Sequence, residues 1–231
     1  MDSPATPIVK DLVLIGGGHA HVQVLKNFGM RPMPGVRLTL IARDIDTPYS
    51  GMLPGYIAGH YSFDDCHIDL APLARFAGVR LYHTEAIAID RSARSVLCRE
   101  RPPVPYDVLS IDIGSRPKAH DVPGAAEHAT PVKPIDRFAA RWLDLVSRVG
   151  SHSGPFRIGV VGGGAGGVEV LLAMRHRLRA LDLAAGRDPD RLSFLLVTAG
   201  ALLATHTPKV AAIFGRVLAE RGVEIRVDAP V

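Results

Sequence analysis

The sequence predicts an α/β protein in which one supersecondary unit, strand–glycine turn–helix–strand, occurs twice. The first copy runs from an apolar segment at 11–15, through "GGGHAH", to a second apolar segment at 36–42. The second copy runs from 157–161, through "GGGAGG" and a long amphipathic segment, to 192–198. Each copy has the length and order of a βαβ unit, so we expect two parallel sheets.

A proline-rich stretch separates the two copies. Four prolines lie between Pro117 and Pro134, with little hydrophobic periodicity. Such a stretch is typical of a crossing between domains. We therefore expect one domain over residues 1–118 and a second over residues 119–231.

Apolar and amphipathic patterns predict the remaining elements. The first helix is expected to be brief, ending near Phe28, and "DTPYSGMLPGYIAGHYSFDDC" is expected to form a loop rich in turn residues. Alternating residues in "VRLYHTEAIAID" and "RSVLC" predict a small antiparallel insertion. Further helices are expected at 70–77, 137–149 and 209–221, and further strands in "YDVLSIDIGSRP" and at 224–227.

Composition limits the classes of partner. Among 231 residues, 47% are hydrophobic and the formal net charge is +4, spread along the chain. This charge suits an anionic small ligand or an anionic membrane surface, and it is too diffuse to indicate nucleic acid. The two cysteines, Cys66 and Cys98, belong to no paired motif, which favours a reducing cytoplasm. The apolar stretch "FLLVTAGALLA" is too short to cross a bilayer, so membrane contact is expected to be peripheral.

The second glycine turn has a complete G-x-G-x-x-G pattern. Gly162 permits the tight turn, Gly164 lets the backbone approach a pyrophosphate, and Gly167 lets the helix pack closely on the strand. The helix N-terminus then faces the negative charge. Glu169 follows inside the helix. The pattern predicts nucleotide binding, the alternative being a purely structural turn.

The first turn matches the pattern at Gly16 and Gly18 only. His21 stands where the third glycine is expected, and we expect it to push the helix outward or to turn its ring away from the strand. A cationic ring is disfavoured in a first helical turn, which predicts a mostly neutral imidazole. His19 and His21 are two residues apart and point to different faces of a helix, so a shared metal site is not expected.

Neither copy carries the acid that usually binds ribose hydroxyls at the end of the second strand. In the first copy this place is Ala42, followed by Arg43 and Asp44. In the second copy it is Thr198, with no arginine close behind. Charge at these places therefore selects neither NADH nor NADPH.

The acidic segment "DDCHID" at 64–69 has residue types that bind metals. No second cluster of ligands with suitable spacing accompanies it. We interpret it as a solvated loop with Asp69 at the start of a helix, and we expect no metal site.

Both turns, with the linking strand "PYDVLSIDIGSRP" and the later "VPG", resemble the two-dinucleotide-domain flavoprotein family of pyridine nucleotide oxidoreductases. The likeness is greater to its type II NADH dehydrogenase and sulfide:quinone reductase branch. "GGGHAHVQVLK", "TPYSGMLPGYIAGHYSFDDCHIDL" and "SIDIGSRP" are similar to the NADH-dehydrogenase-like module that precedes selenide, water dikinase in some bacteria. The linking strand usually ends in Ala-Thr-Gly, and here the last three are Asp112, Ile113 and Gly114.

This resemblance implies two Rossmann-like domains, the first binding FAD and the second NAD(P)H. Family members normally continue beyond this length, so the resemblance also implies a C-terminally incomplete member. The residues implied at the FAD pyrophosphate and adenosine are Gly16, Gly18, His21, Arg43 and Asp44, with 48–54, including Pro54, beside the flavin. Gly114, the glycine that matches the linking strand of the family, is also implied in cofactor binding. Those implied at the nicotinamide nucleotide are Gly162, Gly164, Gly167, Glu169 and Thr198.

The resemblance implies an FAD-dependent NAD(P)H oxidoreductase. Hydride would pass from the nicotinamide, with NADH favoured, to the flavin, and electrons would pass on to a quinone or similar acceptor. A cytoplasmic protein with peripheral contact at the inner membrane face, and with a functional link to selenide, water dikinase, is expected. Two alternatives stay open: a non-catalytic NAD(P)H/FAD-binding module, and a sulfide or selenide oxidoreductase with Cys66 as sulfur carrier.

Overall fold

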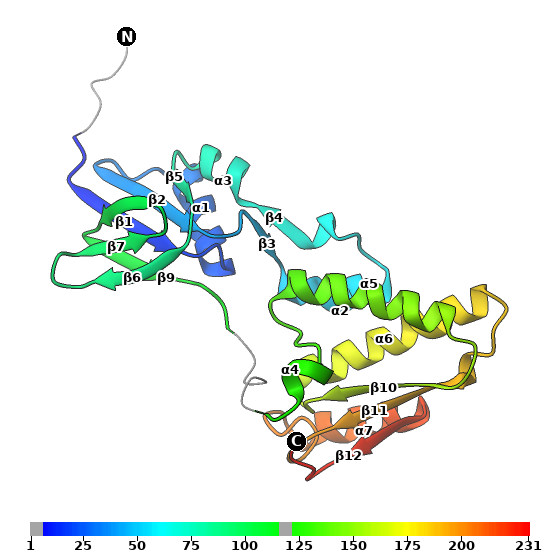
Figure 1. Cartoon of the computed structure of the whole chain (residues 1–231). Helices are drawn as coiled ribbons and strands as arrows, with labels where there is room; N and C mark the ends of the chain where they lie inside the picture. Colours follow the sequence, from blue (N-terminus) through cyan, green and yellow to red (C-terminus); the bar gives the residue numbers. More distant parts are fainter. Residues whose placement is uncertain (1–6, 116–121) are drawn as a thin grey trace. The chain divides into compact units, whose positions relative to one another are not determined.

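A computed structural model describes residues 7–115 and 122–231, which fall into two compact units (Figure 1). The first unit comprises Met1–Tyr49 and His67–Arg116, and the second comprises Ser50–Cys66 and Pro117–Val231. The expected boundary between residues 118 and 119 lies outside the described residues. The sequence predicts that residues 50–66 belong to the first domain, whereas in the structure this short segment belongs to the second unit.

The first unit is built on a parallel sheet of four strands in the order β5-β2-β1-β9. The central strand β1 is buried on both sides, and Val13 and Leu14 are each 1% exposed, which explains its unbroken apolar run. Helix α1 is longer than the sequence predicts. The bounds are β1 Lys10–Ile15, α1 His19–Met30, β2 Val36–Ala42, α3 Leu70–Phe76, β5 Arg80–His83 and β9 Val108–Ile111.

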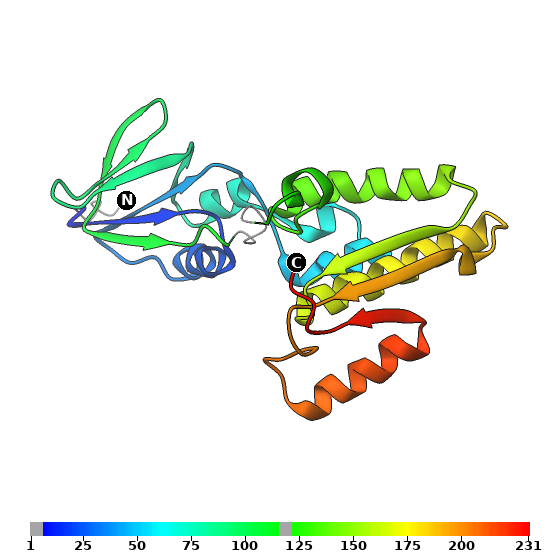
Figure 2. The same cartoon turned by 60° about the horizontal axis from the view of Figure 1, so that its bottom comes forward.

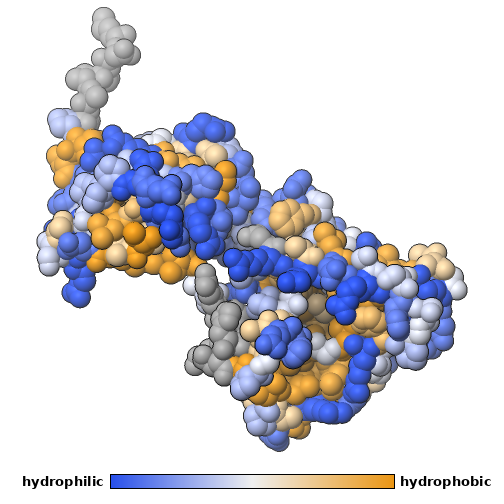
Figure 3. Space-filling model, viewed as in Figure 1, coloured by the Kyte–Doolittle hydropathy of each residue, from blue (hydrophilic) through white to orange (hydrophobic). Residues whose placement is uncertain are grey.

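The expected antiparallel insertion is confirmed as a sheet of three strands. β6 (Ala86–Asp90), β7 (Ser95–Cys98) and β8 (Arg101–Pro105) pair in sequence order. Apolar residues gather on the visible surface of the first unit over β6 and β9 (Figure 3). Ile89 and Val108 are among the exposed side chains on these two strands.

The segment 50–66 leaves the first unit after β3 (Asp46–Pro48) and returns through β4 (His67–Asp69), and these two strands pair antiparallel. The segment contains α2 (Leu53–Ala58), flanked by the 3-10 turns η1 (Ser50–Met52) and η2 (Asp64–Cys66), where the sequence predicts a loop. Pro54 and Gly55 have low helix propensity, so the sequence does not predict this helix. It forms because Leu53 and Ile57 are buried in the core of the second unit.

The second unit repeats the architecture with a parallel sheet of three strands, in the order β10-β11-β12 (Figure 2). The long helix α6 supplies much of the core, and its Leu171 and Leu178 are fully buried. The bounds are α4 Ala125–His128, α5 Ile135–Ser151, β10 Phe156–Val161, α6 Ala165–Ala184, η4 Pro189–Arg191, β11 Leu192–Val197, α7 Pro208–Glu220 and β12 Val223–Arg226. Within the described ranges, no helix combines the length and the apolar character that crossing a membrane requires.

Candidate functional site

The second glycine turn connects β10 to α6. Gly162 has a φ of +118°, and its N–H donates to the carbonyl of Val197 at 2.8 Å, which ties the turn to the end of β11. A Cβ on Gly167 would lie 1.8 Å from the carbonyl oxygen of Gly162. No side chain can therefore stand at the third position, as the pattern predicts for close packing of helix on strand.

The outer side of this turn is open. A Cβ on Gly162 or Gly164 would meet no atom within 4 Å. Gly164 is the N-cap of this 20-residue helix α6, and as a glycine it brings no side chain to cap the helix. The exposed backbone and the positive end of the helix dipole fit the diphosphate of a dinucleotide.

Two other predicted residues flank this turn. Glu169 is exposed in the second turn of α6. Thr198 follows β11 and is buried at 7% exposure. Its side chain packs against Gly163, where a Cβ would lie 2.6 Å from the Thr198 Cβ. Thr198 therefore shapes the turn from inside.

The first glycine turn connects β1 to α1 in the same manner. Gly16 has a φ of +91°, and its N–H donates to the carbonyl of Ile41 at 2.8 Å. A Cβ on Gly16 would lie 2.2 Å from the carbonyl oxygen of Asp112. Glycine is thus required at this position by its backbone conformation and by the close approach of the chain after β9.

His21 at the third position is buried, at 1% exposure. The ring does not turn away from the sheet, which is one of the two alternatives that the sequence predicts. Instead Nδ1 lies 2.7 Å from the carbonyl oxygen of Gly16 and Nε2 lies 2.9 Å from Oγ of Ser110. Because a carbonyl oxygen only accepts, Nδ1 carries a hydrogen, and a neutral ring can accept from Ser110. The ring joins the glycine turn to β9.

Asp112 is the residue at this turn that sequence reasoning missed. Its Oδ2 accepts a hydrogen bond from the N–H of Ala20 at 3.0 Å, and its carbonyl accepts one from the N–H of Gly18 at 3.2 Å. A Cβ on Gly18 would lie 2.2 Å from this carboxylate. The signal in the sequence is the acid that replaces alanine in Ala-Thr-Gly, directly after an apolar strand.

The other residues predicted for the first dinucleotide lie at three separate places. Arg43 and Asp44 follow β2, and the guanidinium of Arg43 donates to Oδ2 of Asp44 at 2.9 and 2.6 Å. Both side chains are about half exposed. Gly114 follows β9 with a φ of +73°. Pro54 lies in the first turn of α2, within the second unit.

In the segment 64–69, Asp69 starts a helix as the sequence predicts, but the expected solvated loop is instead the turn η2 followed by the strand β4. Oδ1 of Asp69 accepts from the N–H of Ala71 at 2.8 Å and so caps α3. Asp65 accepts from the N–H and the hydroxyl of Ser62, and these hydrogen bonds lower the pKa of its carboxyl. Among the residues that the structure describes, no group of three or more potential ligands could hold a metal ion.

Cys66 is buried, at 5% exposure. Burial raises the pKa of its thiol, and the charge of Asp65 raises it further. A thiolate is the reactive form of cysteine, so these surroundings disfavour nucleophilic sulfur chemistry at this residue.

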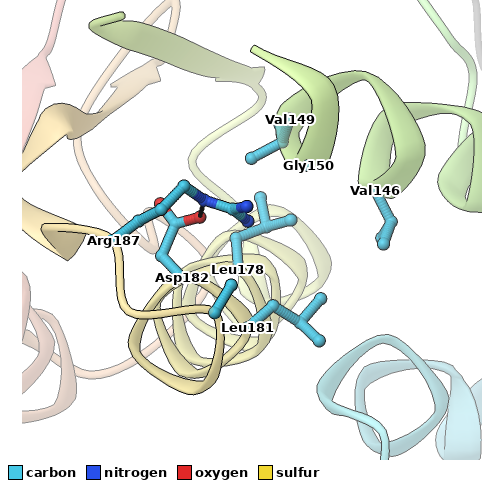
Figure 4. A pocket seen from close by; sticks show the side chains of 8 residues that line it. Val146, Val149, Gly150, Leu178, Leu181, Asp182 and Arg187 are labelled. Atoms are coloured by element: carbon cyan, nitrogen blue, oxygen red, sulfur yellow. Dashed lines mark hydrogen bonds and ion pairs between the residues drawn. The ribbon is translucent and has the colours of Figure 1, made fainter. Parts of the chain in front are cut away.

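A cavity of about 240 Å³ lies between α5 and α6 (Figure 4). Its lining is mostly apolar, and its charged members Asp182 and Arg187 are paired at 2.7 Å. Arg191, outside this lining, also donates to both carboxylate oxygens of Asp182, at 2.7 and 2.8 Å. The charged groups at the cavity are therefore paired within the protein, and we interpret the cavity as a feature of helix packing.

Two units, each with a glycine turn between a parallel strand and a helix N-terminus, define a protein with two dinucleotide-binding folds. Comparison with known families agrees with this class. The chain belongs to the pyridine nucleotide-disulphide oxidoreductase family, whose model matches residues 10–231.

One curated relative and two solved structures are similar to this chain. An NADH dehydrogenase-like protein of Bacillus subtilis, YutJ, is 28% identical over 206 residues, which are 87% of this chain and 52% of the relative. The structure of NDH2 from Plasmodium falciparum in complex with NADH has a TM-score of 0.79 at 18% identity, covering 94% of this chain and 48% of that one. The sulfide:quinone oxidoreductase of Aquifex aeolicus has a TM-score of 0.76 at 21% identity, with 96% and 52% covered. The chain thus spans about half the length of these proteins.

Proposed function

We propose that this chain carries the two dinucleotide units of an FAD-dependent NAD(P)H oxidoreductase. The first unit would hold FAD and the second NAD(P)H, with NADH preferred. When bound, the flavin would accept hydride from the nicotinamide and pass electrons to an acceptor, since the redox chemistry belongs to the cofactor.

The observation that carries this proposal is the second glycine turn. Its backbone at Gly164 is open, the helix behind it is long, and a Cβ at the third glycine, Gly167, would clash with the carbonyl oxygen of Gly162. This chain's own contribution there is to hold a diphosphate on the N–H groups at the start of α6. In the first unit, the corresponding groups lie at the start of α1, behind Gly18.

A quinone is the acceptor that we propose. The sulfide:quinone oxidoreductase of Aquifex aeolicus, named above, supports a quinone-type acceptor. Electron transfer to a quinone would fit peripheral contact with the inner face of a membrane and a cytoplasmic location. We also propose a functional link to selenide, water dikinase, and the sequence resemblance supports it.

The sulfur-carrier alternative receives no support from the structure. A sulfur carrier needs an accessible cysteine with an available thiolate. Cys66 is buried with a raised pKa, and Cys98 is buried at 7% exposure, also with a raised pKa. We therefore do not propose sulfur transfer at either cysteine.

Calorimetric titration with NADH tests the second site. The variant Gly164→Glu should abolish binding, because it introduces bulk and negative charge where the diphosphate approaches. The variant should still fold, since Gly164 has an extended backbone with φ −77° and its Cβ would meet no atom within 4 Å. Gly150→Glu in α5 is the matched control, because a Cβ there also meets nothing within 4 Å.

Wild-type protein and Gly150→Glu should bind NADH with equal affinity. Binding that survives Gly164→Glu would contradict the assignment of this turn. Binding of NADH and FAD without reduction of any acceptor would favour the alternative of a non-catalytic module.

A further inference from the structure

The N-terminus of α1 already has an anionic partner within the chain. The carboxylate of Asp112 accepts the N–H of Ala20 at 3.0 Å. The same carboxylate fills the space next to Gly18, where a Cβ would lie 2.2 Å from its atoms. At the second turn, the N-cap Gly164 has no side chain that could cap α6, and a Cβ added to it would meet no atom of the described chain within 4 Å. The two turns therefore differ in what faces the second glycine.

This difference bears on binding, because the second glycine of the pattern exists to let the backbone approach a pyrophosphate. A carboxylate and a phosphate are both attracted to a helix N-terminus, and they repel each other. A diphosphate that binds at α1 must therefore displace the carboxylate of Asp112 or stay close to its negative charge. Either route lowers the affinity of the turn for the diphosphate.

We propose that Asp112 is an internal competitor for the diphosphate at the first glycine turn and sets the affinity of this unit for its dinucleotide. In the ligand-free chain, the carboxylate satisfies a free N–H group of α1 and holds the turn in its binding geometry. On binding, the diphosphate takes over this role and the side chain turns away. This inference depends on the proposed function, which assigns an FAD diphosphate to this turn.

Removing the charge tests the proposal. Asp112→Asn keeps a hydrogen-bond acceptor for Ala20, and Asp112→Ala removes the side chain beyond Cβ. Titrations with FAD, followed by flavin fluorescence, and with ADP, followed by calorimetry, measure the affinity. We expect the dissociation constants to fall about tenfold in both variants, the scale of a solvent-screened repulsion between two unit charges about 4 Å apart. We also expect Asp112→Ala to melt at a slightly lower temperature, since α1 loses its cap, whereas Asp112→Asn keeps an acceptor for the N–H of Ala20.

Glu100→Gln is the charge-matched control. It lies in the first unit on the exposed turn between β7 and β8, and it removes one negative charge without touching the glycine turn. Its affinity for FAD and ADP should equal that of the wild type. A tenfold gain in this control as well would reduce the effect to net charge and overturn the proposal.

The remaining outcomes separate the two hypotheses. If wild-type protein binds FAD and ADP and both Asp112 variants bind them equally or more weakly, the competitor role is wrong and the proposed function stands. If neither the wild type nor the variants bind FAD or ADP, the proposed function fails at this unit and the inference fails with it. If both variants lose their circular dichroism spectrum, Asp112 is required for folding and the competitor role is overturned.

Discussion

Replacing His21 by alanine should destabilise the first unit without any cofactor present. The ring is fully buried and joins two parts of the chain that are distant in sequence, Gly16 after β1 and Ser110 on β9. Alanine deletes both hydrogen bonds and leaves a cavity under the glycine turn. The loss should therefore exceed that of an exposed residue in the same helix.

The size of the effect follows from these contacts. Each lost hydrogen bond costs about 1 kcal/mol net. Truncating a buried ring costs about 3 kcal/mol or more where the site cannot collapse. Because imidazole is smaller than the rings behind that figure, its truncation should cost about 2 kcal/mol, and with the two hydrogen bonds we expect a total of about 4 kcal/mol in the free energy of unfolding. For a unit of this size, the loss corresponds to a fall of about 10 °C or more in melting temperature.

Denaturant unfolding followed by circular dichroism measures this change, with His19→Ala as the matched control. His19 is exposed and contacts Tyr49 edge-on, with ring centroids 4.7 Å apart, so its removal should cost less than about 1 kcal/mol. Equal, small losses in the two variants would refute the bracing role of His21. His21→Gly should lose more than His21→Ala, because glycine in a helix costs about 1 kcal/mol relative to alanine.

Three further predictions follow from the second unit. Asp182→Ala should cost about 3–5 kcal/mol, since it leaves the buried charge of Arg191 without its carboxylate partner, and thermal unfolding measures this loss. Burial raises the pKa of Asp182, but the hydrogen bonds and charges of Arg191 and Arg187 outweigh it, so the folded pKa lies below the ordinary value. The stabilisation by this carboxylate is therefore complete above the unfolded pKa of about 4 and is lost as the pH falls through the folded pKa. Acid unfolding of the wild type, compared with that of Asp182→Ala, measures this pH dependence. Gly167→Ala should destabilise the protein by about 1–3 kcal/mol and weaken NADH binding, because its Cβ would lie 1.8 Å from the Gly162 carbonyl oxygen. The control Gly166→Ala should change neither stability nor NADH binding, because a Cβ there meets nothing within 4 Å. Cys66→Ser should leave NADH binding unchanged in calorimetry, and a large loss would restore a role for this thiol.

Local patterns in the sequence predict most of the fold. Both βαβ units, the antiparallel insertion and the capping of α3 by Asp69 are confirmed, because each depends on residues close together in the chain. Helix α2 escapes prediction because its six residues contain a proline and a glycine. It is stabilised by burial of Ile57 in a core formed by residues more than 70 positions later, which no local pattern encodes.

The site is predicted in type but not in detail. The glycine pattern identifies both turns, and the steric role of Gly167 follows directly from it. The partners of His21 and Asp112 could not be predicted, since Ser110 and Ala20 reach them only when β9 pairs beside β1. Long-range register of this kind decides whether a polar side chain faces solvent or braces the turn.

In the proposed function, the two glycine turns bind FAD and NADH in one oxidoreductase. The absorbance spectrum of the protein reconstituted with FAD, recorded before and after anaerobic addition of NADH, tests it most directly. We predict a flavin spectrum that bleaches on addition of NADH in the wild type and in Gly150→Glu, and that stays unchanged in Gly164→Glu. A protein that gains no flavin absorbance with FAD, or a bound flavin that bleaches equally in Gly164→Glu, would contradict it.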